Sequence, residues 1–215
     1  MLETDFVPAQ EKDARWLMVV LHGLGDSMEG YRWLPQILRE PRLNYLLVNA
    51  PDAYYDGFSW YDFAQDPAPG VRRSYAALGS LLDEQRRRGF RTEETFLFGF
   101  SQGCVMTIEL GLRYPYRFAG IIGISGYVHE PEDLLKQRSP VAKEQRFLLT
   151  HGTDDPLIPI APVRASIKLL EADGLQIEWH EFAKEHTIAG EEELSLIRQF
   201  VQKCCKVESR KGGSV

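Results

Sequence analysis

Six short apolar segments of the sequence alternate with five longer segments that carry apolar residues at helical spacing. Each short segment is rich in β-branched, aromatic or leucine residues, and the middle ones are apolar at successive positions, as in strands covered on both faces. The predicted strands are residues 16–21, 45–48, 95–98, 120–125, 147–151 and 177–182. The predicted helices are residues 30–39, 72–88, 102–114, 161–172 and 191–204. This order predicts an α/β fold with a mostly parallel sheet and helices on both faces.

The length of the chain limits how this pattern is divided. A chain of 215 residues is long enough for one substantial core and too short for two comfortable domains. We therefore expect one domain over residues 1–205, followed by a flexible tail at 206–215. Proline and glycine gather at 66–70, which we interpret as a loop inside the domain.

Charge and cysteine content narrow the class of protein. The formal net charge is −6, so no basic surface for nucleic acid or for an anionic membrane is expected. The N-terminus does not resemble a signal peptide, and no apolar run approaches the length of a membrane span. Three cysteines make no disulfide framework, which favours a cytoplasmic protein without stable membrane insertion. The sequence does not indicate an oligomeric state.

A serine between two glycines marks the junction of a predicted strand and a predicted helix. In GFSQG, Ser101 lies two residues after Gly99 and two before Gly103. A turn this tight brings the flanking residues close together, so side chains there would collide, and glycine removes the collision. The pattern is that of a nucleophile elbow, in which the hydroxyl is lifted clear of the backbone. A glycine turn of purely structural origin is the alternative.

A serine nucleophile needs a histidine base and an acid. In this topology the acid follows the serine along the chain, and the histidine follows the acid. His186 lies in the loop AKEHTIAG between the last strand and the last helix, whereas the other histidines after Ser101 lie in or near strands or precede the acids. The segment TDDP supplies Asp154 and Asp155, and the prolines that follow favour Asp155. Either aspartate could instead cap the next helix, but both lie too far upstream.

Two backbone amides are expected to stabilise the oxyanion. The amide of Gln102 follows the nucleophile, and Gly23 and Gly25 allow the loop LHGLGD to direct the amide of Leu24 towards it. Met28 stands where a dinucleotide-binding GxGxxG motif requires glycine, and His22 and Asp26 lack a third metal ligand at suitable spacing. No cofactor and no metal are expected.

Five motifs in order along the chain, LHGLGDS, SWYD, GFSQG, HGTDDPLIP and EHT, resemble those of the phospholipase/carboxylesterase family of α/β-hydrolases. This family includes acyl-protein thioesterases and small bacterial carboxylesterases. The resemblance implies the same assignments: nucleophile Ser101, acid Asp155, base His186, oxyanion amides at Leu24 and Gln102, and an acyl site bordered by Trp60 and Leu157. The chain departs from the family pattern at Cys104, which we interpret as a small packing residue or a redox-sensitive thiol, and at Glu185, where glycine is common.

The resulting hypothesis is a serine hydrolase that cleaves small-molecule carboxylic esters or thioesters with short to medium acyl chains, through an acyl-enzyme. One alternative is a lactonase like dienelactone hydrolase, which typically uses cysteine at the elbow. Another is a binding module that has kept the fold and lost catalysis.

The segment 126–146 bears on access to the site. Its 21 residues leave room for a short helix near 131–137 and not for a cap of several helices. We therefore expect an open, shallow cleft edged by aromatic residues such as Trp60.

Overall fold

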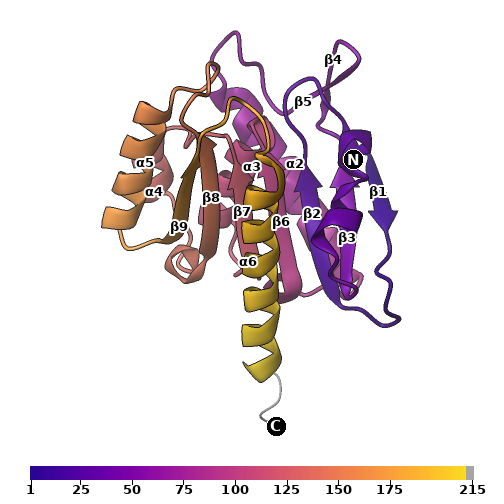
Figure 1. Ribbon diagram of the computed structural model, residues 1–215. Coiled ribbons are helices and arrows are strands. Elements are labelled where there is room, and N and C mark those ends of the chain that lie inside the picture. The colour runs from indigo at the N-terminus through magenta and orange to yellow at the C-terminus, as the bar shows by residue number, and fades with distance from the viewer. Residues whose placement is uncertain (212–215) are drawn as a thin grey trace.

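The computed structural model describes residues 1–211, with side chains through residue 206 (Figure 1). A seven-stranded sheet has the order β1-β3-β2-β6-β7-β8-β9. All neighbouring strands in it are parallel except the edge strand β1, which pairs antiparallel with β3. The bounds are β1 Thr4–Val7, β2 Trp16–Leu21, β3 Leu43–Val48, β6 Thr95–Phe100, β7 Gly120–Ile124, β8 Arg146–Gly152 and β9 Gln176–Phe182. The predicted mostly parallel sheet is confirmed.

Helices cover both faces of the sheet, as the apolar strands require. One apolar core lies between the sheet and helices α2, α3, α4 and α5. A second core lies on the other face, under α1 and α6, and Figure 1 shows α6 crossing that face in front of the strands. The bounds are α1 Leu34–Leu38, α2 Ala68–Arg87, α3 Gln102–Arg113, α4 Pro131–Lys136, α5 Ile160–Ala172 and α6 Gly190–Lys211.

Three strands were missing from the sequence prediction. The edge strand β1 alternates between exposed and half-buried residues in a polar segment, so it lacks the apolar signal of its neighbours. The strands β4 (Asp52–Tyr54) and β5 (Gly57–Ser59) form a separate two-stranded sheet and have only 3 residues each. Strands this short fall below the usual length of a recognisable period.

In the first half of the chain, two predicted helices have different bounds in the structure. The segment predicted as one helix over 30–39 is split into the 3₁₀ turn η1 (Met28–Tyr31) and α1, and Arg39 directly after α1 has a left-handed conformation. Helix α2 begins at Ala68, inside the segment interpreted as a loop. Pro69 fits the first turn because that turn needs no amide donor from it, and Asp66 accepts a hydrogen bond from the Ala68 amide.

At the C-terminus the last helix is longer than expected. Helix α6 continues to Lys211, so residues 206–211, predicted as part of a flexible tail, are helical. The rest of that predicted tail, 212–215, lies outside the described residues.

The segment after β7 contains no cap domain within the described residues. It holds only α4 and the 3₁₀ turn η3 (Ala142–Glu144), in agreement with the prediction. Another 3₁₀ turn, η2 (Thr92–Glu94), lies directly before β6. No helix within residues 1–211 is both long and apolar enough to cross a bilayer.

Candidate active site

The turn at Ser101 joins β6 to α3 in a conformation that few residues adopt. Ser101 has φ 53° and ψ −116°, a region that costs on the order of 1–3 kcal/mol and persists only where the surroundings enforce it. A Cβ on Gly99 would lie 2.3 Å from the carbonyl oxygen of Gly103. A Cβ on Gly103 would lie 2.1 Å from the carbonyl oxygen of Leu21, at the end of β2. Both glycines are therefore required, the second because α3 begins against the backbone of a neighbouring strand.

Three loops at the carboxyl edge of the sheet bring Ser101, Asp155 and His186 together. The Ser101 hydroxyl lies 2.9 Å from His186 Nε2, and His186 Nδ1 donates to Asp155 Oδ2 at 2.7 Å. Because the carboxylate accepts from Nδ1, the lone pair of the neutral imidazole lies on Nε2, facing the hydroxyl. The arrangement has the geometry of a serine nucleophile with its base and orienting acid.

The second oxygen of Asp155 is held by the backbone. Asp155 Oδ1 accepts from the amides of Leu157 and Ile158, each at 2.9 Å. Burial acts to raise the pKa of Asp155, but these amides and the His186 ring outweigh it, and the pKa of the carboxyl lies below its usual value. Asp155 therefore stays ionised beside His186. The neighbouring Asp154 is exposed, and its amide donates to the Lys184 carbonyl.

Leu24 and Gln102, whose amides are the predicted oxyanion donors, line the same cavity as Ser101. Neither amide donates to another group within residues 1–211. Gly25 has φ +76°, which turns the loop after β2, and a Cβ on Gly23 would lie 3.0 Å from the Phe100 ring. Two donors without protein partners beside a nucleophile suit a developing oxyanion.

His22 supports the loop that carries Leu24. Its Nδ1 donates to the Gly23 carbonyl at 2.6 Å, and its Nε2 accepts from the Ala50 amide at 3.0 Å. Burial lowers the pKa of His22, in keeping with a neutral ring. Since both nitrogens are occupied, the ring has no lone pair for a metal.

The side chain of Gln102 is a structural element of the site that sequence reasoning missed. It is buried, accepts from the Trp60 amide at 2.9 Å and donates to the Tyr61 carbonyl at 2.9 Å. The Ser59 hydroxyl donates to it at 3.2 Å. These bonds join the elbow to the segment after β5. The elbow motif placed Gln102 next to the nucleophile, but the sequence did not predict the hydrogen-bond partners of its side chain.

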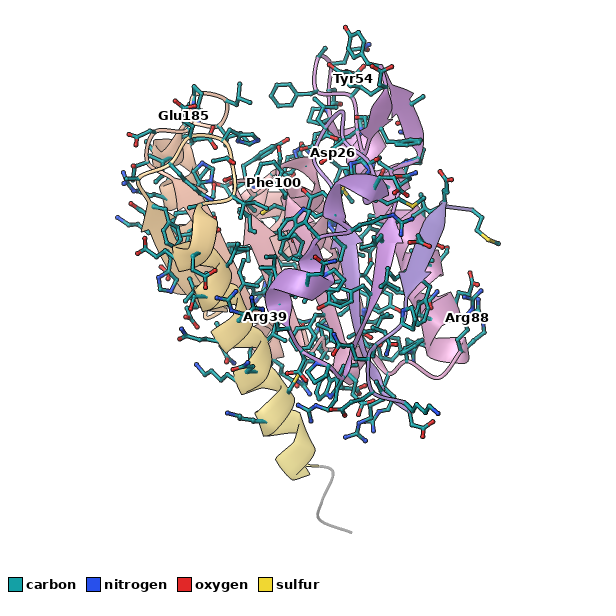
Figure 2. The ribbon with its side chains drawn as sticks, turned by 45° about the vertical axis from the view of Figure 1, so that its right-hand side comes forward. Asp26, Arg39, Tyr54, Arg88, Phe100 and Glu185 are labelled. Atoms are coloured by element: carbon teal, nitrogen blue, oxygen red, sulfur yellow. The ribbon has the colours of Figure 1, made fainter. Side chains whose placement is uncertain are left out.

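A cavity of about 400 Å³ opens beside the serine. Its apolar walls include four aromatic residues: Tyr61 and Phe63 from the segment after β5, Phe100 at the end of β6, and Tyr127 from the segment after β7. Leu157, predicted at the acyl site, lies at the cavity with 67% of its surface exposed. Phe100 and Asp26, both labelled in Figure 2, border the cavity.

The predicted border role of Trp60 is wrong. Trp60 has 0% exposure and does not line the cavity, because its indole nitrogen donates to the His22 carbonyl and its ring packs 5.5 Å from the His22 ring. The wall is formed by the residues that follow it along the chain. The aromatic motif was therefore located correctly, but the tertiary packing decides which ring faces the substrate.

A buried ion pair anchors the loop that carries His186. Lys184 Nζ lies 2.6 Å and 2.8 Å from the two carboxylate oxygens of Glu193 in α6. Glu193 also accepts from the Thr150 hydroxyl on β8 and from the Ala189 amide. Burial lowers the pKa of Lys184, while Glu193 opposes that shift. The sequence contained no signal for this pair, since both residues look like ordinary surface charges.

Cys104 lies behind the elbow, in α3. Its thiol is buried, and a Cβ on Gly123 or on Gly126 would lie 2.6 Å from its sulfur. Burial raises the pKa of Cys104 to about 12. These features fit the interpretation of Cys104 as a small packing residue.

The chain is similar to known esterases and thioesterases in both sequence and structure. Residues 2–205 match the model of a family described as phospholipase/carboxylesterase. Acyl-protein thioesterase 1 of Schizosaccharomyces pombe is 34% identical over 166 residues, covering 71% of this chain and 74% of the relative. The crystal structure of esterase PE8 has a TM-score of 0.85 at 28% identity, covering 94% of this chain and 99% of that one. Carboxylesterase SOBER1 of Arabidopsis thaliana, in its crystal structure, has a TM-score of 0.81 at 25% identity, covering 89% and 100%.

Proposed function

This chain belongs to the phospholipase/carboxylesterase family of α/β-hydrolases, and on that premise we propose that Ser101, His186 and Asp155 are its catalytic triad. The protein is a serine hydrolase of carboxylic esters or thioesters. The observation that carries the residue assignment is the pair of contacts made by the His186 ring, 2.9 Å to Ser101 Oγ and 2.7 Å to Asp155 Oδ2.

In the proposed mechanism, Ser101 Oγ attacks the carbonyl carbon of the substrate while its proton passes to His186 Nε2. The amides of Leu24 and Gln102 donate to the oxygen that becomes negative. As the bond to the leaving group breaks, the proton moves from Nε2 to the leaving alcohol or thiol. Water then attacks the acyl-enzyme by the same route, which releases the carboxylic acid and restores the serine. Asp155 holds the tautomer throughout and stabilises the imidazolium.

We propose acyl chains of short to medium length as substrates. The cavity of about 400 Å³ has aromatic walls next to the nucleophile, and Leu157 and Phe63 are exposed at its edge. Apolar walls favour burial of the first carbons of the chain, and no cap within the described residues covers the rest. A cytoplasmic location remains a prediction from the cysteine content.

The direct test is active-site labelling. A fluorophosphonate probe is expected to modify Ser101, and Ser101→Ala is expected to lose labelling and on the order of 10⁶-fold of kcat on p-nitrophenyl octanoate. Ser80→Ala, which removes an exposed hydroxyl on α2, is the matched control and keeps both. An unlabelled wild-type protein would favour a binding module, and more than a few per cent of activity in Ser101→Ala would contradict the assignment.

A further inference from the structure

The loops around the cavity carry charge of almost one sign. Five loop segments connect the carboxyl ends of strands to the following helices: 22–27, 49–67, 125–130, 153–159 and 183–189. Together they contain nine aspartates and glutamates but only one lysine or arginine, Lys184. Lys184 is buried against Glu193 and so adds no positive charge to the surface. The loops at the entrance therefore carry mostly carboxylates, of which Asp52 is paired with Arg73 in α2.

Several of these carboxylates are exposed and have no compensating cation. Asp26, Asp56, Asp62, Asp154 and Glu185 are exposed, and none forms an ion pair within the described residues. Their positions differ: Asp26 borders the cavity, Asp62 lies between two wall residues, and Asp154 and Glu185 each precede a triad member. The charges come from four loops rather than from one cluster. They act together on anything that approaches the serine.

The opposite edge of the sheet has a different balance. The loops there, at 8–15, 39–42, 88–94, 114–119, 137–145 and 173–175, hold nine lysines and arginines and seven acids. In Figure 2, Asp26 and Glu185 lie towards the upper end with Tyr54, and Arg39 and Arg88 lie lower on the molecule. The negative field is thus a property of the active-site end and not only of the net charge of the chain.

Exposed apolar side chains lie among these charges. Tyr55 is 92% exposed and Phe63 61%, both in the segment 49–67, and Leu157 in the segment 153–159 is 67% exposed. Aromatic faces attract cations as well as apolar groups. A surface of carboxylates and aromatic rings extending beyond the cavity suits a partner that is larger than a simple alcohol and positively charged.

We propose that the active-site end selects substrates in which the ester or thioester is carried by a peptide segment rich in lysine and arginine. This inference rests on the proposed function, because it concerns the leaving group of the same reaction. The acyl chain enters the cavity, and the cationic side chains on either side of the acylated residue face the carboxylates of the loops. A small cation could approach only some of these charges, since they lie on four loops, whereas an extended peptide reaches several. The same field opposes polyanionic leaving groups.

The test uses three octanoyl-cysteine peptides of equal length, flanked by lysine, by serine or by glutamate. We expect kcat/KM to be on the order of tenfold higher for the lysine peptide than for the glutamate peptide at low ionic strength, with the ratio approaching one as salt is raised. Equal rates at low salt, or a preference for the glutamate peptide, would overturn the inference. Octanoyl-thiocholine carries a single small cation, and a preference confined to it would overturn the peptide assignment.

Charge-reversal variants locate the effect. The triple variant Asp56→Lys, Asp154→Lys and Glu185→Lys changes three exposed residues of the loop set. The matched control, Glu11→Lys, Glu144→Lys and Glu171→Lys, makes the same change in net charge at exposed positions of the opposite end. The first variant is expected to lose or invert the preference for the lysine peptide, and the control to keep it. An equal loss in both variants would contradict a local effect.

A neutral substrate separates this inference from the proposed function. Both variants are expected to keep their activity on p-nitrophenyl octanoate, which has no charged flanks. A wild-type enzyme active on that ester but indifferent to peptide charge contradicts only the present inference. A wild-type protein inactive on that ester and on all three peptides contradicts the proposed function itself.

Discussion

Asp154 and Asp155 are neighbours in the sequence, yet the fold gives them different surroundings. Asp155 is buried, and its two oxygens accept from His186 and from two backbone amides, whereas Asp154 is exposed. The difference follows from the turn after β8, which directs one side chain towards the base and the other to solvent. Chemistry at the residue scale therefore depends on orientation more than on residue type.

We expect Asp155→Asn to reduce kcat by on the order of 10⁴-fold, as when the orienting acid of a serine hydrolase is replaced and the histidine tautomer becomes wrong. Asp154→Asn, the matched control, is expected to change kcat by no more than about twofold. Steady-state kinetics on p-nitrophenyl octanoate measure both. Equal losses, or the larger loss at Asp154, would show that the acid is misassigned.

Cys104 is expected to be unreactive in the folded enzyme. Because burial raises the pKa of its thiol to about 12, only about one molecule in ten thousand carries the thiolate at pH 8. Iodoacetamide at pH 8 should leave both Cys104 and the esterase activity unchanged, as peptide mapping and an activity assay will show. Alkylation of Cys104 accompanied by loss of activity would instead support a redox-sensitive thiol at this position.

At the scale of elements, the site depends on loops held by the helices that follow them. The loop between β9 and α6 carries His186. It is held to α6 by an ion pair between the Lys184 ammonium and Glu193 in the first turn of that helix. The carbonyl of Lys184 also accepts from the Asp154 amide, which links this loop to the one carrying the acid. Two of the three triad loops are thus joined through one lysine.

Lys184→Met is expected to destabilise the protein by about 3–5 kcal/mol, because it leaves the Glu193 carboxylate buried without its cation. Urea unfolding followed by tryptophan fluorescence measures the change in the free energy of unfolding. Lys168→Met, at an exposed position of α5, is the matched control and should change it by less than about 0.5 kcal/mol. A similar small effect of both substitutions would mean that the pair contributes little to stability.

At the scale of the whole molecule, the absence of a cap within the described residues leaves the entrance open. The segment between β7 and β8 folds into one short helix and one 3₁₀ turn, which packs beside the sheet without forming a separate cover. Access to the serine is then controlled by the size of the cavity, about 400 Å³, and by the loops at its edge.

We expect kcat/KM for p-nitrophenyl esters to rise by up to about fourfold per methylene over the first few carbons, since each buried methylene contributes roughly 0.8 kcal/mol. The rise should then level off, because further methylenes remain in water. No jump in rate is expected at the critical micelle concentration of the substrate. Steady gains to sixteen carbons, or a sharp interfacial jump, would reveal a deep acyl tunnel or a lid.

The sequence by itself determined the features that local chemistry requires. The order of apolar strands and amphipathic helices specified the mostly parallel sheet, because only helices on both faces can bury strands that are apolar on both sides. Gly99 and Gly103 marked the elbow, because no other residue fits between the backbones there. The prolines after TDDP favoured Asp155, and the loop between the last strand and the last helix favoured His186. The fold brings these two residues within hydrogen-bond distance of each other.

Only the tertiary structure decided which side chains face the cavity and which support it. Trp60 and Tyr61 are consecutive aromatic residues, and the sequence could not tell that Trp60 turns inward to His22 while Tyr61 lines the cavity. Lys184 and Glu193 lie nine positions apart and read as surface charges until α6 folds back and buries them together. Orientation and burial arise from contacts between distant segments, and such contacts leave no local period or motif in the chain.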